Sequence, residues 1–288
     1  MRVTEGRLLE LASRAMREQQ SRVGEASAQL SSGARVRVAS EDPAAWAEAT
    51  RARAEAVLRR GESSALGRAS DRLGESEAVL ASVSESLSRA LELSVQLGND
   101  TYSPADRARA AEEVRGLSQA LMTLVNSKDG LGEPLFAGAA IDGPAFDASG
   151  AYVGDADPRA IATMDGQLVS TALTGDRLAS GVNPFAILDQ LATALASNDG
   201  AAVRSLVGDL QGTVGQAADA QATVGEYRAR IQGALDAQGA LLTQIDQRTA
   251  RLVGADPIAA ASDLAKAAGG VEAARAAAET ILSAFRSR

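Results

Sequence analysis

Apolar and small side chains recur at helical spacing along most of the chain, and in several stretches the repeat is seven residues long. The clearest repeat lies between Gly200 and Asp256, where no proline interrupts the chain. Its positions are Leu210, Ala217, Val224, Ile231, Gln238, Ile245 and Leu252. A straight helix drifts by about 20° per heptad from such a repeat, so a seam of this length predicts a helix packed along a rod with left-handed supercoiling.

A second stretch without internal proline, from Ala44 to about Leu97, predicts another long helix. Its apolar register places Leu73, Leu80 and Leu87 on one heptad position and Val83, Ala90 and Leu97 on the other. Turn residues follow at 98–104, and a further helix is expected from Ala105 to about Lys128. Because the connection is short and both helices carry an apolar face, we expect an antiparallel pair.

The two ends of the chain predict thinner amphipathic helices at residues 3–30 and 258–285. The first carries Leu9, Met16, Val23 and Leu30 along its seam, and the last carries Leu264, Val271, Ile281 and Phe285. Helices with so little apolar surface are weak alone. We therefore expect each to pack on the other and on neighbouring copies, so that these eight residues are candidate subunit contacts.

The pattern changes between Gly130 and Val182, which hold nine glycines and three of the seven prolines. Short apolar runs separated by turn dipeptides predict short strands and hairpins. The fold class is thus mainly α: a long helical rod, an antiparallel coiled-coil bundle built from both chain halves, with a small β-rich tip insertion. We expect five segments: 1–32, N-terminal assembly helix; 33–129, rod helices; 130–182, β-rich outer tip; 183–254, returning rod helices; 255–288, C-terminal assembly helix.

The composition of the chain argues against several classes of function. A formal charge of −8 and a pI near 4.8 argue against nucleic-acid binding. The absence of cysteine and histidine removes thiolate metal sites and the commonest nucleophiles and general bases, so we expect no enzyme and no cofactor. Asp155, Asp157 and Asp165 lack the spacing of a calcium loop, and surface turns explain them better than a metal site. Nothing approaches 18 consecutive apolar residues, and we expect no membrane partner and no cleaved secretion signal.

The connection between the first two helices has a distinctive composition. Ser31, Ser32 and Gly33 end the first helix, with Gly33 suited to a left-handed cap, and Pro43 suits the first turn of the next. An N-terminal helix cap explains both Glu41 and Asp42. For Arg35 and Arg37 two interpretations stay open: a solvated loop edge, or contacts with acidic groups of the next subunit, with Asp42 a further contact candidate. The stretch Leu30-Ser31-Ser32-Gly33 to Pro43-Ala44 resembles the corresponding loop of the flagellin superfamily.

A second motif distinguishes among the members of that superfamily. Asn126, followed by Leu135-Phe136-Ala137-Gly138 and then Pro144 and Phe146, resembles the signature of the flagellar hook-associated protein 3 family. Glu133-Pro134 replaces the family's usual Arg-Tyr, and Ala145 separates Pro144 from Phe146. The resembling motif positions are Ser31, Ser32, Gly33, Asp42, Pro43, Asn126, Leu135, Phe136 and Gly138.

The resemblance implies a structural component of the bacterial flagellum that forms the junction ring between hook and filament. It also implies type III export without signal cleavage, an extracellular place on the flagellum, and four partners: other copies of itself, the other hook-associated junction protein, flagellin and an export chaperone. The alternatives are a short flagellin that builds the filament and, further removed, a coiled-coil scaffold protein.

Overall fold

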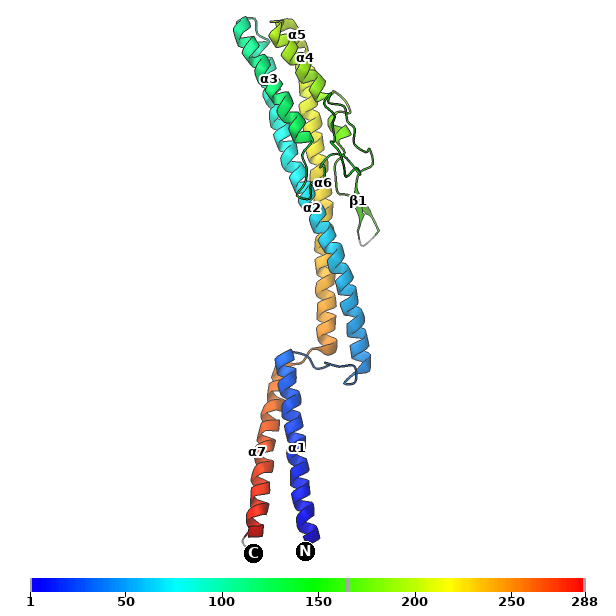
Figure 1. Cartoon of the computed structure of the whole chain (residues 1–288), viewed down its shortest axis with the longest axis vertical. Coiled ribbons are helices and arrows are strands. Elements are labelled where there is room, and N and C mark those ends of the chain that lie inside the picture. Colours follow the sequence, from blue (N-terminus) through cyan, green and yellow to red (C-terminus); the bar gives the residue numbers. More distant parts are fainter. Residues whose placement is uncertain (1, 164–165, 287–288) are drawn as a thin grey trace. The chain divides into compact units, whose positions relative to one another are not determined.

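The computed structural model describes residues 2–163 and 166–286, and side chains at positions 2–6, 8, 9 and 284–286 lie outside the description. The elements, shown in Figure 1, are α1 (Arg2–Ser32), α2 (Pro43–Leu97), α3 (Pro104–Val125), β1 (Ala160–Ala162), β2 (Leu168–Ser170), the 3₁₀ turn η1 (Gly175–Leu178), α4 (Pro184–Ala196), α5 (Gly200–Ser205), α6 (Val207–Val253) and α7 (Pro257–Arg286). The long helices predicted before residue 129 and at 258–285 are confirmed to within a few residues at each end. The helix predicted between Gly200 and Asp256 is confirmed as α6, which begins only at Val207 because the short helix α5 and a turn precede it.

The chain divides into two compact units. One comprises residues 1–60 and 240–288, and the other comprises residues 61–239. Both units contain a part of α2 and a part of α6. The five segments expected from the sequence cut the chain differently and remain a prediction.

The core of the 61–239 unit follows the heptad positions. On α2, Leu73, Leu80 and Leu87 are at most 2% exposed, and the predicted positions of α6 from Leu210 to Ile231 are fully buried. Helix α3 runs antiparallel to α2 and packs beside α4 (Figure 1). The repeat in the sequence is therefore the seam of a mainly helical bundle.

A buried arginine joins the turns at one end of this bundle. Arg107 of α3 is 5% exposed, and its guanidinium donates hydrogen bonds to the backbone oxygens of Leu97 (3.0 Å) and Asn99 (3.0 Å) and to Oδ1 of Asn198 (2.6 Å). It thereby occupies carbonyl groups that the end of α2 leaves unsatisfied. The turn after α2 and the turn after α4 are both fixed to α3 by this one side chain.

The segment between α3 and α4 holds little regular strand. Strands β1 and β2 pair antiparallel with Ile161 opposite Val169, and isolated bridges such as Phe146 to Tyr152 order the rest. The ring of Phe146 lies 5.5 Å from that of Tyr152 and 5.7 Å from that of Phe185 on α4. Phe146 and Phe185 are buried in the same apolar cluster as the helices, and the half-buried Tyr152 packs against it, because a segment of this size cannot build a core of its own.

In the other unit, α1 packs beside α7 (Figure 1). The first part of α2 and the last part of α6 share two small apolar clusters. One contains Val36, Ala45, Ala49 and Val253; the other contains Ala52, Ala56 and Ile245. Each cluster is small and includes two alanines, so α2 and α6 make narrow contacts here instead of a thick core.

Candidate assembly surfaces

The α1–α7 pair buries very little apolar surface. Among the side chains of the pair that the structure describes, the buried ones are alanines: Ala26 on α1 and Ala260 and Ala267 on α7. The predicted seam residues are only half-buried or, for Leu30, 37% exposed; the half-buried ones are Met16, Val23, Leu264, Val271 and Ile281. The side chains of Leu9 and Phe285 lie outside the described residues.

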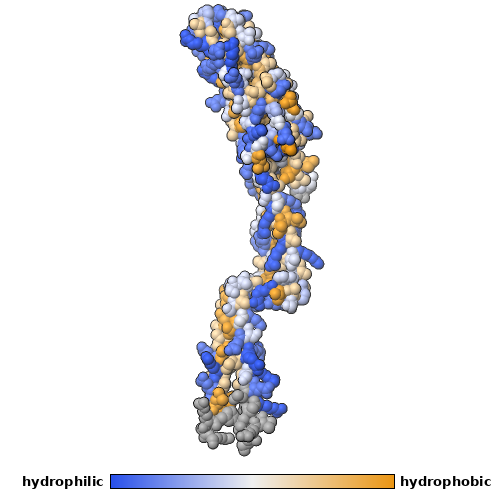
Figure 2. Space-filling model, viewed as in Figure 1, coloured by the Kyte–Doolittle hydropathy of each residue, from blue (hydrophilic) through white to orange (hydrophobic). Residues whose placement is uncertain are grey.

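Large apolar side chains on these two helices also face solvent. Leu11 on α1 is 62% exposed, and on α7 Ile258 is 81% and Leu282 50% exposed. On the face of this helix pair that Figure 2 shows, hydrophobic and hydrophilic residues are interspersed. The α1–α7 pair therefore leaves apolar surface in contact with water, and covering it would be favourable in proportion to the apolar area removed from water.

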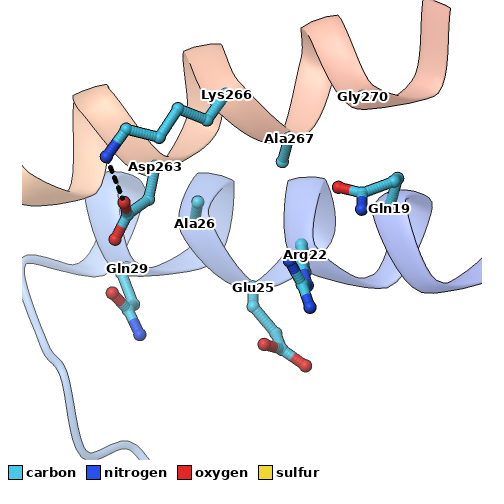
Figure 3. Close-up of a pocket in the computed structure, with 9 residues that line it drawn as sticks. All are labelled: Gln19, Arg22, Glu25, Ala26, Gln29, Asp263, Lys266, Ala267 and Gly270. Carbon is cyan, nitrogen blue, oxygen red and sulfur yellow. Dashed lines mark hydrogen bonds and ion pairs between the residues drawn. The ribbon is translucent and has the colours of Figure 1, made fainter. Parts of the chain in front are cut away.

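A polar groove of about 520 Å³ lies between α1 and α7 (Figure 3), lined by Gln19, Arg22, Glu25, Ala26, Gln29, Asp263, Lys266, Ala267 and Gly270. At Gly270 the side chain of Gln19 lies against the backbone of α7, and an added Cβ would lie 2.8 Å from Oε1 of Gln19. Glu25 and Gln29 point away from α7 in this view, and Lys266 pairs with Asp263 on its own helix at 3.5 Å. The pair is thus joined through small and polar side chains.

The loop between α1 and α2 has the predicted helix ends. Gly33 has φ +65°, and its N–H donates to the carbonyl of Gln29 at 2.8 Å, which confirms the left-handed cap. Pro43 is the first residue of α2, and Oδ1 of Asp42 accepts from the N–H of Ala45 at 3.0 Å. The hydroxyls of Ser31 and Ser32 both donate to the carbonyl of Ala28, so these serines complete the last turn of α1.

Glu41 differs from the sequence prediction, which assigned it to the cap of α2. Its carboxylate accepts instead from the N–H of Arg37 at 2.6 Å and pairs with the Arg37 guanidinium at 2.8 Å. The hydrogen bond from the Arg37 amide and that from its guanidinium lower the pKa of Glu41 below its ordinary value. The cap prediction was wrong for Glu41 because a carboxylate four residues after an arginine can turn back to that residue as easily as forward to the helix.

Arg35, the other basic residue of the loop, also has partners in its own chain. The Arg35 guanidinium donates to the carbonyl of Leu252 at 2.8 Å and lies 3.5 Å from Asp42. The Arg35 backbone N–H donates to the carbonyl of Val253, and the N–H of Ala255 donates to that of Gly33. These hydrogen bonds attach the loop to the connection between α6 and α7. The Arg35 side chain is nevertheless half exposed.

Asn126, which directly follows α3, brackets Phe146: its side-chain amide forms hydrogen bonds with both backbone groups of that residue. Its Oδ1 accepts from the N–H of Phe146 at 2.9 Å, and its Nδ2 donates to the carbonyl of Phe146 at 3.0 Å. The amide thus satisfies both backbone groups of a residue that is only 1% exposed. This contact gives the motif asparagine a structural role.

The following motif residues form the inner layer of the tip. Leu135 and Phe136 are at most 1% exposed. Gly138 has φ +64°, and a Cβ there would lie 2.1 Å from the carbonyl oxygen of Asp155, a contact that no side chain could make. Burial raises the pKa of the nearby Tyr152 to about 12, and the charge of Asp176 acts in the same direction.

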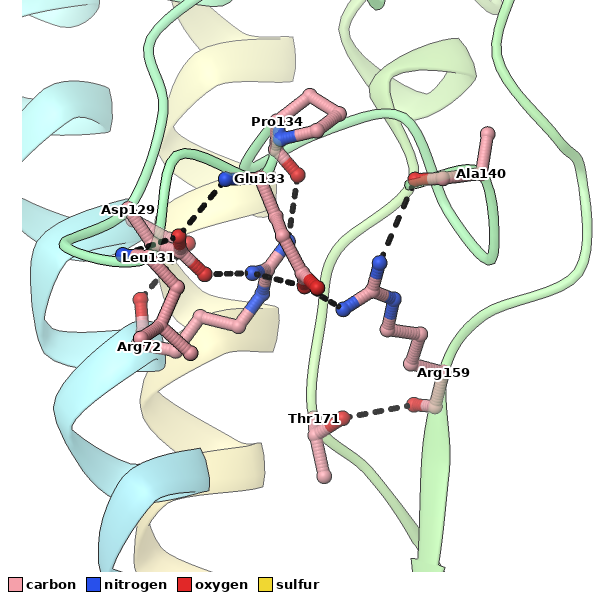
Figure 4. Close-up of polar contacts among 9 residues, drawn as sticks. Arg72, Asp129, Leu131, Glu133, Pro134, Ala140, Arg159 and Thr171 are labelled. Atoms are coloured by element: carbon pink, nitrogen blue, oxygen red, sulfur yellow. Dashed lines mark hydrogen bonds and ion pairs between the residues drawn. The ribbon is translucent and has the colours of Figure 1, made fainter. Parts of the chain in front are cut away.

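An ion-pair network connects α2 to the tip (Figure 4). Arg72, with a side chain 9% exposed, pairs with Asp129 and donates to the carbonyl of Pro134 at 2.5 Å, and Glu133 pairs with Arg159. Burial lowers the pKa of Arg72, as does the charge of Arg159, against the opposing effects of the two carboxylates. Burial alone would raise the pKa of Asp129, but amide hydrogen bonds from Glu133 and Leu131 and the Arg72 charge lower it overall.

Sequence reasoning missed this network and Arg107. Arg72 immediately precedes the seam residue Leu73 and looks like any solvent-facing arginine of a long helix, while its partners lie far along the chain. The one available signal was the departure at Glu133-Pro134, because both of these residues contact the arginines. The two residues that differ from the family's usual Arg-Tyr are therefore among those through which the tip contacts α2.

The carboxylates of the tip form turns. Oδ1 of Asp155 accepts from the N–H of Asp157 at 3.0 Å, whereas Asp165 lies outside the described residues. Throughout residues 2–163 and 166–286, no three side chains of metal-ligating type gather where they could hold an ion. The helices in these same ranges include none that is both long and apolar enough to cross a membrane.

Comparisons with known proteins give one matching family model and several solved structures of similar fold. Residues 9–140 match the family described as the bacterial flagellin N-terminal helical region. Two solved structures share the fold. A protein of Vibrio parahaemolyticus assigned as a flagellar hook-associated protein has a TM-score of 0.68 at 21% identity, covering 74% of this chain and 100% of that one. Flagellar hook associated protein-3 of Legionella pneumophila has a TM-score of 0.60 at 17% identity, covering 71% and 98%. The chain therefore shares the helical fold of these two solved structures.

Two curated relatives are more specific, and both are named flagellar hook-associated protein 3. That of Salmonella typhimurium is 37% identical over 133 residues, covering 44% of this chain, and that of Escherichia coli is 31% identical over 189 residues, covering 58%. The chain spans 40% and 58% of the length of these relatives. The resemblance to the flagellar hook-associated protein 3 family is confirmed.

Proposed function

We propose that this chain is a structural, non-catalytic component of the bacterial flagellum and forms the junction ring between hook and filament. The observation that carries the proposal is that both curated relatives, at 37% and 31% identity, bear the name of the hook-associated protein. In the motif that distinguishes this family from flagellin, Leu135, Phe136 and Ala137 are buried, and Asn126 is hydrogen-bonded to the backbone of Phe146.

In this proposal the terminal helices supply the contacts between copies. Helices α1 and α7 leave Leu11, Ile258 and Leu282 exposed, which supports their burial by neighbouring helices. The seam residues are the candidate contacts, and Arg35, Arg37 and Asp42 are further candidates at the loop. The segment 1–32 and the segment 255–288 act as assembly helices, the helices of 33–129 and 183–254 as the rod, and 130–182 as the outer tip.

The partners proposed are copies of the same chain within the ring, the other hook-associated junction protein on the hook side, and flagellin on the filament side. Before assembly an export chaperone holds the chain, which leaves the cell through the flagellar type III apparatus without signal cleavage. The small amount of buried apolar surface on α1 and α7 supports chaperone binding before assembly, because helices with so narrow an apolar face gain most of their stability from packing on other helices.

A deletion strain tests the role. If the chain forms the junction, cells that lack it retain hooks, lose filaments and release flagellin monomers into the medium, and the full-length gene restores filaments. Normal filaments in the deletion strain would contradict the proposal, as would bare hooks in cells that make no flagellin at all.

A matched pair of variants then tests the assembly helices. Val271→Asp places a charge at a half-buried position of α7, whereas Glu272→Gln changes the adjacent exposed position. We expect Val271→Asp to be made at normal levels in the cell but to restore few filaments, and Glu272→Gln to restore them fully. Equal restoration by both variants would remove Val271 from the assembly surface.

A further inference from the structure

The seam between α2 and α6 is interrupted at one level. From Val57 to Ala65 no residue of α2 is buried, and between Ile231 and Ile245 on α6 only Gln238 is buried; both stretches lie wholly in the described part of the chain. On either side the seam is apolar, with Leu66 and Ile231 on one side and Ala56 and Ile245 on the other. The interruption is therefore local.

At this level of the seam, α2 and α6 are joined by a polar contact between Glu62 and Gln238 instead of by two apolar side chains. Gln238 is 1% exposed, and its Nε2 donates to a carboxylate oxygen of Glu62 at 2.9 Å. Gln238 continues the heptad positions that Ile231 and Ile245 occupy, so it replaces an apolar residue at a seam position. A polar residue at such a position fixes register but contributes less stability than an apolar one.

A glycine adjoins each member of this polar pair: Gly61 precedes Glu62, and Gly239 follows Gln238. Both glycines lie inside a helix, where glycine is the least favourable residue after proline. Packing does not require them, because a Cβ at either position would meet nothing within 4 Å.

We propose that α2 and α6 form a built-in hinge at Gly61 and Gly239, where the helix pair opens locally and bends while the apolar seam beyond Leu66 stays closed. Two independent features coincide there: a glycine with open space at its Cβ position in each helix, and a gap in the buried apolar positions that the polar residue Gln238 fills on α6. This opening is a property of the helix pair itself and does not depend on the proposed place in the flagellum.

Hydrogen exchange of the full-length chain tests the hinge. Backbone amides in 57–65 and 233–243 are expected to exchange at least about tenfold faster than those beside Leu80 and Val224, because local opening exposes them without global unfolding. Protection in these two windows equal to that beside Leu80 would overturn the proposal.

Variants with a matched control sharpen the test. Replacing both hinge glycines (Gly61→Ala, Gly239→Ala) is expected to slow exchange in the two windows roughly 25-fold, since each change favours the helix about fivefold. The control pair Gly116→Ala and Gly215→Ala also changes exposed helical glycines with open space around them, and should alter the windows by less than about twofold. Equal slowing by both pairs would show a general helix effect and overturn the hinge.

Gln238→Leu provides a second, independent arm. It restores an apolar seam residue while leaving both glycines in place, and exchange in the same windows should slow by at least about fivefold. Unchanged exchange in this variant would remove the polar seam residue from the hinge.

Discussion

Asn126→Ala tests whether the motif asparagine holds the tip in place. In the folded chain the two ends of its amide satisfy the N–H and the carbonyl of Phe146, at 2.9 Å and 3.0 Å. Phe146 is 1% exposed, so water cannot readily replace either partner. Alanine leaves one donor and one acceptor buried without a hydrogen bond.

The expected cost follows from these two groups. A buried backbone group that loses its partner costs about 1–3 kcal/mol, so the loss of two partners should lower the free energy of unfolding by about 2–6 kcal/mol. Asn126→Asp keeps an acceptor for the N–H of Phe146 but places a second oxygen against its carbonyl. We expect that variant to retain only part of the stability.

The free energy of unfolding is measured by urea denaturation followed by circular dichroism, and hydrogen exchange locates the change. Exchange should increase first at residues 144–153, which depend on the bracket. Asn99→Ala is the control, because Asn99 is exposed and its side chain accepts only from the nearby N–H of Thr101. A loss below about 0.5 kcal/mol for Asn126→Ala, or an equal loss for Asn99→Ala, would refute the reasoning.

Three further predictions concern stability. Gly138→Ala should cost at least about 2 kcal/mol in urea unfolding, because its positive φ and the close carbonyl of Asp155 exclude a Cβ, whereas Gly130→Ala, with open space around it, should be near neutral. Arg107→Ala should cost about 3 kcal/mol, since it leaves buried carbonyls of two turns without a donor; a loss under about 1 kcal/mol would contradict this. The pKa of Asp129 is lowered on folding from its ordinary 3.8, so its contribution is present at neutral pH and lost as pH falls through and below that value. The stability difference between wild type and Asp129→Asn should therefore shrink between pH 5 and pH 3, and a difference that grows in acid would have the wrong sign.

The helices and their seam could be predicted from the sequence because their determinants are local and periodic. Leu73, Leu80 and Leu87 recur at sevens and are buried as expected. Gly33 and Pro43 mark helix ends through backbone geometry that each residue carries by itself. Such features need no knowledge of distant contacts.

The polar contacts could not be predicted, because their partners are far apart in sequence. Arg72 meets Asp129, and Arg107 meets Asn198, across 57 and 91 positions respectively. Nothing near either arginine distinguishes it from the many solvent-facing arginines of the chain. Glu41 shows the same limit at short range, since two competing donors lay within reach and sequence alone did not decide between them.

The most direct test of the junction role is the position of the protein on intact flagella. Gold-labelled antibody against this chain, viewed by electron microscopy on cells that carry complete filaments, reports that position. The account predicts label confined to one band where hook meets filament, absent from a deletion strain. Label distributed along the whole filament would contradict it and identify a filament subunit instead.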